Sequence, residues 1–335
     1  MSMFNFKDHK KLFKSWRRAG MFLLAALLAA AMAAPASAGN DPDTEDRNSG
    51  YYPTDVEEYP ELSVIYEGVD LQDQMYGFED KQAMMREREA DHLKYDSDSM
   101  TVSCREFETD NHRVILTHIL VRDPGSQVKA GLSNDTFGGE QERTTSFARR
   151  TGAVVAVNGS YFYYGTGKPI DICAPVVFHD GEILRDGGSN GSEICLRFDG
   201  SFFSPHPNLR FDSQTLLSLG VVSSFGTADP LLISDGMPMS FPAGVTDSVY
   251  PRTAIGVVFP GDYYLITAGY DGSYSGGLSY KQMQSIFYHL GCSYARSFDG
   301  GGSATLVING DLVNVPAAGY ERKVVDFLAF YSLDE

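Results

Sequence analysis

Short apolar runs separated by glycine-containing turn pairs recur along the chain from about residue 100 onward. Runs rich in β-branched and aromatic side chains predict strands, and Asp-Gly, Asn-Gly or Pro-Gly pairs between them predict tight turns. The Asp-Gly pairs at Asp180 and Asp199 follow one another closely, so this part predicts an antiparallel meander. The predicted strands are 113–121, 152–157, 176–179, 182–185, 194–198, 201–204, 231–234, 251–258, 263–268, 303–308, 311–315 and 322–331.

Helical patterns are fewer. Residues 280–290 place Met283, Ile286, Phe287 and Leu290 on one face, and Ser279 precedes them as a capping residue. Residues 145–150 suit a short helix, and residues 80–95 a highly charged, exposed helix. Because strands greatly outnumber helices, we expect an α+β fold with a mixed or mainly antiparallel sheet, a few helices and a single catalytic domain.

The first 38 residues have the layout of a secretory signal peptide. Six basic residues precede the apolar stretch 19–34, and Ala36-Ser37-Ala38 matches a cleavage site. The apolar stretch is also just long enough to span a membrane, so an uncleaved N-terminal anchor is the alternative. We therefore expect export to the cell envelope or the medium, with a signal peptide at 1–38, an acidic spacer with a charged helix at 39–100 and the catalytic domain at 101–335.

The charge balance narrows the range of partners. The whole chain has 27 basic and 44 acidic side chains, for a net charge of −17, and without residues 1–38 the net charge becomes −22. Such a surface repels nucleic acid and anionic lipid, so we expect neither as a partner, and membrane contact only through an uncleaved signal. An anionic substrate would need a locally basic pocket.

Four cysteines occur, at positions 104, 173, 195 and 292, and an exported chain allows them to pair. Cys173 and Cys195 flank consecutive predicted hairpins. The sequence allows two alternatives, a disulfide bridge between neighbouring strands and buried free thiols. No C-x-x-C pair or Cys/His cluster indicates zinc.

One stretch, 299–303, has a composition suited to chemistry: Asp299 stands before three glycines and Ser303. Consecutive glycines allow close approach of the backbone and let N–H groups line a concavity for an anion. The apolar run that follows ends in Asn309-Gly310, which predicts a type I′ hairpin turn. Taken alone, a plain tight turn at Asp299-Gly300 is an equally good interpretation.

Four segments together resemble the phosphodiester glycosidase domain family, which includes the enzymes that uncover mannose-6-phosphate tags. The segments are Asn158-Gly-Ser-Tyr-Phe, Arg252-Thr-Ala-Ile-Gly, Asp271-Gly before a helix, and Asp299-Gly-Gly-Gly-Ser-Ala-Thr with Arg322-x-Val. Their order and spacing extend from about residue 113 to 331. One departure is Ser160, which stands where the family usually has a second glycine.

The resemblance implies hydrolysis of a glycosyl-1-phosphodiester, in which positive charge builds on the sugar ring and carboxylates act. The leaving group is a phosphate, so cations and N–H donors matter more than a strong general acid. We therefore expect Asp299 to be the nucleophile or base and Asp271 a second carboxylate, against the alternative that both are turn residues. The expected substrate-binding residues are Arg252, Arg322, Asn158, Gly300, Gly301, Gly302 and Ser303.

Each of these residues also has a structural alternative: an ion pair for the arginines, a cap of a buried strand for Asn158 and backbone satisfaction for Ser303. No cofactor is certain, and a divalent cation (Ca²⁺ or Mg²⁺) bridging Asp271 or Asp299 to the phosphate is a further expectation without an assigned ligand set. The expected function is an exported hydrolase acting on an envelope or secreted glycan. The alternatives are a non-catalytic glycan-binding module and a phosphodiesterase that attacks phosphorus.

Overall fold

The computed structural model describes residues 59–66, 69–109, 112–163, 171–241, 245, 247–269 and 272–334. The predicted signal peptide, the first part of the predicted spacer (39–58) and the predicted second carboxylate, Asp271, lie outside these residues. Within the described part of the chain, no helix is both long and apolar enough to cross a membrane.

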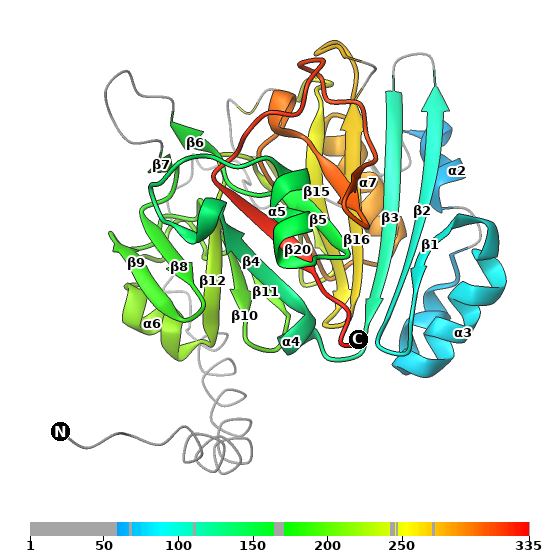
Figure 1. Cartoon of the computed structure of the whole chain (residues 1–335), viewed down its shortest axis with the longest axis horizontal. Coiled ribbons are helices and arrows are strands. Elements are labelled where there is room, and N and C mark those ends of the chain that lie inside the picture. Colours follow the sequence, from blue (N-terminus) through cyan, green and yellow to red (C-terminus); the bar gives the residue numbers. More distant parts are fainter. Residues whose placement is uncertain are drawn as a thin grey trace, which may run out of the picture. The chain divides into compact units, whose positions relative to one another are not determined.

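An eight-stranded antiparallel sheet forms one side of the domain (Figure 1). Its strands, in spatial order, are β1 (Leu93–Asp96), β2 (Met100–Thr109), β3 (His112–Val121), β16 (Asp262–Gly269), β15 (Arg252–Phe259), β17 (Tyr294–Ser297), β13 (Leu231–Ser234) and β14 (Met237–Pro238). On β15, alternate residues point to opposite faces: Ile255 and Val257 enter one core, and Ala254 and Val258 enter a second core with α7 (Tyr280–His289). Helix α7 therefore covers one face of this sheet.

A five-stranded sheet packs against the other face. Its order is β19 (Asp311–Leu312), β18 (Leu306–Ile308), β5 (Val155–Asn158), β20 (Asp326–Phe330) and β4 (Val128–Leu132). Val155 and Val157 of β5 share the inter-sheet core with Ile255, whereas Ala156 packs with Phe147 of α5 (Thr144–Thr151) on the outer face. The result is a helix–sheet–sheet–helix arrangement of layers in the α+β class, as predicted.

The remaining strands form smaller units. They are β6 (Phe162–Tyr163) with β7 (Asp171–Ile172), β8 (Val176–His179) with β9 (Glu182–Asp186), and β11 (Phe202–Phe203), β10 (Glu193–Arg197) and β12 (Val221–Gly226), with α4 (Pro124–Gln127) and α6 (Ser213–Ser218) beside them. The prediction of one continuous meander is wrong, because the two Asp-Gly hairpins belong to separate sheets. The turn at Asp180-Gly181 has the expected positive φ angles of 48° and 81°.

All four cysteines are free thiols, so the structure forms no bridge between Cys173 and Cys195. Cys195 is fully buried on β10 and Cys173 is half-buried. Of the two alternatives that the sequence left open, the structure therefore has the free thiols.

The N-terminal segment departs from the predicted spacer. Its elements are η2 (Pro60–Leu62), α2 (Ser63–Tyr66), η3 (Leu71–Met75), α3 (Phe78–Arg88) and η4 (Ala90–His92), followed by β1. The helix predicted for 80–95 ends at Arg88, and residues 93–96 instead join the large sheet as its edge strand. Leu62 and Ile65 are buried in the same core as α7, so this part of the predicted spacer belongs to the domain.

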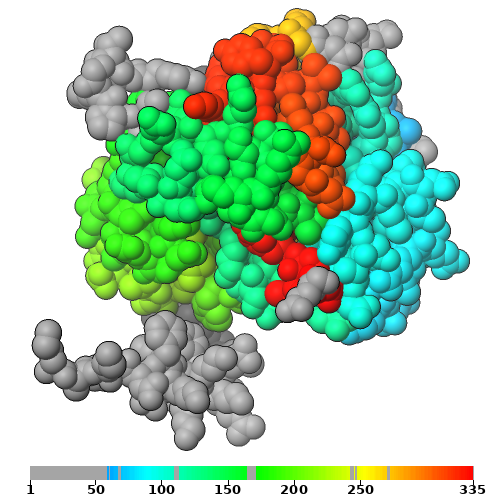
Figure 2. Space-filling model, viewed as in Figure 1, coloured from blue at the N-terminus to red at the C-terminus, as the bar shows by residue number. Residues whose placement is uncertain are grey.

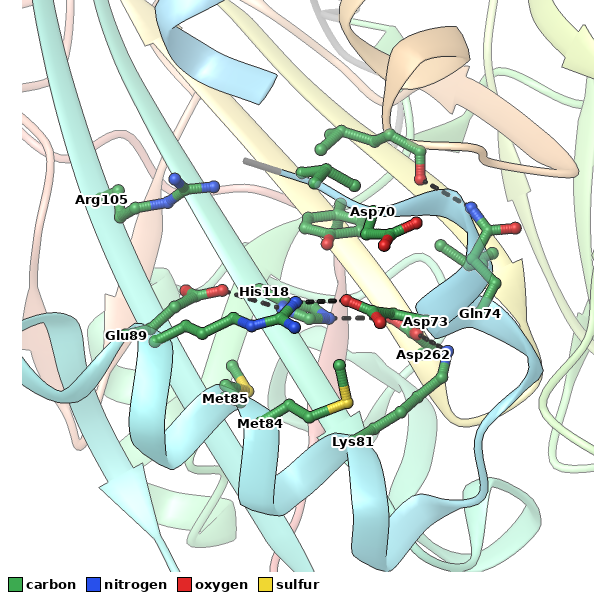
Figure 3. Close-up of a pocket in the computed structure, with 15 residues that line it drawn as sticks. Asp70, Asp73, Gln74, Lys81, Met84, Met85, Glu89, Arg105, His118 and Asp262 are labelled. Carbon is green, nitrogen blue, oxygen red and sulfur yellow. Dashed lines mark hydrogen bonds and ion pairs between the residues drawn. The ribbon is translucent and has the colours of Figure 1, made fainter. Parts of the chain in front are cut away.

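A buried chain of charges anchors α3 to the sheet (Figure 3). Lys81 Nζ lies 2.6 Å from Asp262 Oδ2, and His118 Nε2 lies 2.9 Å from Asp262 Oδ1, with Glu89 on the other side of the imidazole ring. Burial alone would lower the pKa of His118, but the two carboxylates raise it to about 9, so the ring is an imidazolium at neutral pH. These four groups form part of the wall of a cavity of about 370 Å³, and their charges balance.

Helix α7 begins with the predicted cap. Ser279 Oγ accepts a hydrogen bond from the N–H of Gln282 at 3.2 Å, and the Gln282 side chain accepts one from the N–H of Ser279 at 2.9 Å. We expect Ser279→Ala to lower the free energy of unfolding by about 1 kcal/mol, measured by urea denaturation, because the N–H of Gln282 loses its acceptor, Ser279 Oγ. Ser279→Thr, which can still cap, is the control, and equal losses in both variants would contradict the capping role.

Candidate active site

The ends of four strands from the two large sheets meet at one place. Asp299 follows β17, and its N–H donates to the carbonyl of Gly159, which follows β5, at 2.9 Å. Arg252 begins β15 and Asp326 begins β20. Strand ends from both sheets thus bring together polar residues that are far apart in the sequence.

Asn158 ties this junction together from inside. Its Nδ2 donates to the carbonyl of Asp299 at 2.6 Å, and its Oδ1 accepts from Thr253 Oγ1 at 2.8 Å and from the N–H of Thr305 at 3.1 Å. The side chain is fully buried. The alternative, a polar cap at the end of a buried strand, describes the position of Asn158, and its contact with substrate stays a prediction.

The glycine-rich loop is a closed 3₁₀ turn rather than an open anion nest. The N–H of Gly301 donates to the carbonyl of Pro251 at 2.8 Å, and the N–H groups of Ser303 and Ala304 donate to carbonyls of the loop itself. Glycine is required here because a Cβ on Gly300 would lie 2.5 Å from the Pro251 carbonyl oxygen and Gly301 has φ of +60°. Three N–H groups of this segment are therefore bonded within the protein, and a contact between the loop and phosphate stays a prediction.

Ser303 and Arg322 lie beside Asp299, as predicted for one site. Arg322 Nη1 donates to Ser303 Oγ at 3.3 Å, and Ser303 lies close enough to the Asp299 carboxylate to lower its pKa. Arg322 is partly exposed to solvent. A carboxylate, a hydroxyl and a cation are thus linked at the protein surface.

In Figure 2 the orange-to-red segment after residue 300 borders the green segment around α5. The border is held by hydrogen bonds from Thr145 Oγ1 to Glu321 at 2.6 Å and between Thr144 and Thr305 at 2.7 Å. These contacts fix the segment that carries Arg322 against the five-stranded sheet.

Arg252 is buried, and its guanidinium group is hydrogen-bonded to other residues of the protein. Its Nη1 donates to Tyr280 Oη at 2.9 Å and lies 3.4 Å from Asp229 Oδ2, while its Nε and Nη2 donate to the carbonyls of Leu278 and Ser248. The guanidinium also stacks on the Tyr280 ring at 4.1 Å. The structural alternative, a buried ion pair at the start of a strand, fits these contacts, and the phosphate contact of Arg252 stays a prediction.

Asp229 is a site residue that the sequence reasoning missed. Its Oδ1 accepts from Tyr280 Oη at 2.7 Å and from Tyr161 Oη at 2.9 Å. Burial raises the pKa of Asp229, although the hydrogen bond from Tyr280 and the charge of Arg252 oppose this rise. Tyr161 belongs to the Asn158-Gly-Ser-Tyr-Phe segment and could have been found there, whereas Asp229 stands in a loop without a recognisable pattern.

Asp326 is the second missed carboxylate. It is fully buried, and its Oδ1 accepts from the N–H of Ser160 at 2.6 Å while its Oδ2 accepts from Ser160 Oγ. Burial raises its pKa to about 7, against the lowering effect of the Ser160 hydrogen bonds. Ser160, the departure from the family's usual glycine, therefore contacts a buried carboxylate rather than the surface of a pocket.

The pKa of Asp299 is raised to about 6. Burial is the largest cause, and the charge of Asp229 adds to it, whereas Ser303 and Arg322 lower the pKa. At neutral pH Asp299 is ionised, yet it can take up a proton close to physiological pH. A half-buried carboxylate with this property can act as a nucleophile or as a general base.

The described residues contain no group of three or more His, Cys, Asp or Glu side chains arranged to hold a metal ion. Asp229 is bonded to an arginine and two tyrosines, and Asp326 is bonded to Ser160, so neither presents a free carboxylate to a cation. A divalent cation near Asp299 or Asp271 stays a prediction.

Comparisons with known proteins agree with the observed fold. The sequence model of the phosphodiester glycosidase family matches residues 151–331, more than half of the chain. A stretch of 201 residues is 30% identical to the SPbeta prophage-derived uncharacterized protein YomE of Bacillus subtilis (strain 168) and covers 58% of this chain. The match spans only 30% of the length of that relative.

Two solved structures share the fold. The catalytic domain of zebrafish N-acetylglucosamine-1-phosphodiester alpha-N-acetylglucosaminidase, auto-inhibited by its pro-peptide, is 21% identical with a TM-score of 0.57, and the match covers 71% of this chain and 86% of that chain. A hypothetical protein from Synechocystis is 14% identical with a TM-score of 0.52, covering 70% of this chain and 62% of that chain. At these identities the likeness concerns the fold.

Proposed function

Because the chain belongs to the phosphodiester glycosidase family, we propose that it hydrolyses the sugar C1–O bond of a glycosyl-1-phosphodiester. The observation that carries this proposal is the Asp299–Ser303–Arg322 arrangement. It places an ionisable carboxylate with a raised pKa beside a cation that lowers this pKa. Membership in the family supports a glycosidase-type reaction. The Asp299 carboxylate and the Arg322 cation suit a reaction in which phosphate is the leaving group on the sugar.

In this reaction the C1–O bond breaks and its electron pair goes to the phosphate oxygen. Positive charge develops on the sugar ring, and the negative charge of Asp299 stabilises it. Asp299 either attacks C1 to form a glycosyl ester that water then hydrolyses, or accepts a proton from the water molecule that attacks C1. The phosphate is already a stable anion, so it needs charge neutralisation rather than protonation. Arg322 is positioned to provide that charge, since it is linked to Asp299 through Ser303.

The two buried carboxylates have supporting roles in this proposal. Asp229 raises the pKa of Asp299 by its charge and fixes Tyr161, Tyr280 and Arg252 around it. Asp326 holds the Gly159–Ser160 turn, whose Gly159 carbonyl accepts the Asp299 N–H. Together they keep Asp299 in place without touching substrate.

The substrate class is proposed from the predicted N-terminal signal and the strongly acidic composition. An exported chain meets envelope or secreted glycans. A surface with many negative charges repels anions, so an anionic substrate group would bind only next to a cation such as Arg322. The proposed substrate is therefore a glycan or glycoconjugate that contains a sugar-1-phosphodiester.

Hydrolysis in ¹⁸O-labelled water tests the reaction class. We expect the label in the released sugar, because water or Asp299 attacks C1. Label in the phosphate would identify a phosphodiesterase that attacks phosphorus and would end the proposal. Absence of turnover across a panel of sugar-1-phosphodiesters, together with glycan binding, would instead identify a binding module.

Removal of the cation should weaken catalysis. We expect Arg322→Ala to lower kcat/KM by about a hundredfold, because the departing phosphate loses a charge-assisted partner. The acidic limb of the pH profile should also move to higher pH, since the Arg322 charge lowers the pKa of Asp299. Steady-state kinetics against pH measures both effects.

Arg149→Ala is the matched control, because Arg149 lies on α5 with its side chain 65% exposed and pairs with Asp311 at the surface. It should leave kcat/KM unchanged. An Arg322→Ala enzyme within threefold of wild type would show that phosphate is bound elsewhere.

A further inference from the structure

Two exposed tyrosines stand next to the glycine-rich loop. Tyr250 precedes β15 and Tyr274 lies between β16 and α7, and they are 37% and 41% exposed. Their ring centroids are 6.0 Å apart with a tilt of 35°, so the two rings form one continuous aromatic surface. Single exposed aromatic side chains are common on proteins, whereas a contacting pair beside a carboxylate and a cation is the kind of lining that small-molecule sites have.

The hydroxyl groups of both rings lie against the glycine-rich loop. A Cβ on Gly301 would lie 2.8 Å from Tyr250 Oη, and a Cβ on Gly302 would lie 2.6 Å from Tyr274 Oη. Both hydroxyl groups therefore contact the loop that begins at Asp299. The successive glycines that the sequence singled out leave room for these tyrosines.

The hydrogen bonds of each tyrosine also connect it to the candidate active site. Tyr250 exchanges backbone hydrogen bonds with Leu278 at 3.3 and 3.1 Å, and the next carbonyl, that of Pro251, accepts the Gly301 N–H. Tyr274 Oη accepts a hydrogen bond from Arg322 Nη2 at 3.4 Å. Arg322 thus lies between Tyr274 on one side and Ser303 on the other.

We propose that Tyr250 and Tyr274 form a platform that binds the pyranose ring of the substrate, with its C–H face stacked on the aromatic rings. A pyranose has an apolar face of C–H groups and hydroxyl groups around its edge, which suits an aromatic ring with one polar tip. The platform places the sugar beside Asp299 and its 1-phosphate beside Arg322. This inference rests on the proposed function, because it takes the site to hold a sugar-1-phosphodiester.

Stacking and support of the loop can be separated by substitution. Phenylalanine keeps the ring and removes the hydroxyl, whereas alanine removes both. We expect Tyr250→Ala and Tyr274→Ala each to raise KM about five- to tenfold with kcat within twofold of wild type, because binding is lost equally in the ground and transition states. The Phe variants should stay within twofold in both constants.

The probes are N-acetylglucosamine 1-(methyl phosphate) for kinetics and methyl α-N-acetylglucosaminide, which has no phosphate, for binding by saturation-transfer NMR and calorimetry. Tyr163→Ala, at a 63% exposed tyrosine on β6, is the control and should change neither. Melting temperatures of all variants check that the domain is folded.

The outcomes distinguish the platform from the proposed function. If the wild type hydrolyses the diester while both Ala variants keep its KM, the platform is overturned and the function stands. If the wild type does not hydrolyse it but binds the methyl glycoside with an affinity that the Ala variants lose, the platform stands and the function fails. Equal losses in the Phe and Ala variants, or no sugar binding by the wild type, overturn the platform.

Discussion

Asp299→Asn is expected to lower the hydrolysis of a sugar-1-phosphodiester by about a thousandfold or more. Asparagine has nearly the shape of aspartate and can still accept the hydrogen bond from Ser303, so the loop keeps its geometry. It cannot attack C1 or accept a proton, however, and it leaves the positive charge on the sugar ring without a counter-charge. The measurement is kcat/KM with a sugar-1-phosphodiester, with circular dichroism to confirm folding.

The pH dependence of the wild type gives a second readout of the same prediction. Because the ionised form of Asp299 reacts and its pKa is about 6, activity should fall as the pH drops through about 6. Asp311→Asn, whose side chain is 85% exposed on β19, is the control for loss of one negative charge and should retain full activity. A residual activity of Asp299→Asn within tenfold of wild type would assign the chemistry to another group.

Local patterns in the sequence predicted those features of the fold that depend on neighbouring residues. The turn at Asn309-Gly310 has φ angles of 52° and 80°, as a type I′ hairpin requires, and Ser279 caps α7 in a capping box. The position of Asp299 beside Ser303 and Arg322 was predicted from the resemblance rather than from periodicity, because Arg322 lies on a separate segment. The structure confirms that these residues lie together.

The roles of Asn158 and Arg252 were not accessible from the sequence. A polar residue at the end of a buried strand can face a substrate or the protein, and only tertiary packing decides between these. In the structure Asn158 has three protein partners, and Arg252 lies between tyrosine rings and a carboxylate. Asp229 and Asp326 were missed for the same reason, since neither stands in a pattern that indicates its burial.

The N-terminal segment shows the limit of reasoning from charge. The stretch 80–95 is highly charged, which is typical of an exposed helix, yet Lys81 is buried against Asp262. A lysine whose partner is an aspartate on a distant strand cannot be distinguished in the sequence from a solvated lysine. Buried ion pairs of this kind depend on contacts between distant segments.

The buried Asp326 makes the stability of the folded protein depend on pH. Its pKa in the folded protein, about 7, is higher than the ordinary value of 3.8, so the folded state disfavours the ionised form. The contribution of this group to stability is therefore full below about pH 4, declines as the pH rises, and is lost above about pH 7. A shift of this size corresponds to about 4 kcal/mol.

We expect Asp326→Asn to raise the free energy of unfolding by about 2 to 4 kcal/mol at pH 8 and to change it little at pH 4.5, measured by urea denaturation at both values. Asparagine stays neutral and can still accept the N–H of Ser160, but its amide group fits the Ser160 hydroxyl less well, so the gain falls below the full shift. The activity limb near pH 6 should change little, because Asp326 is mostly protonated where Asp299 titrates. Asp311→Asn is the control and should show no such difference between the two pH values. A loss of stability at pH 8 in Asp326→Asn would contradict the prediction, because it would mean that the Ser160 hydrogen bonds stabilise the ionised carboxylate by more than burial destabilises it. A stabilised, active variant would instead show that the buried carboxylate lowers the stability of this junction at neutral pH while Asp299 carries the chemistry.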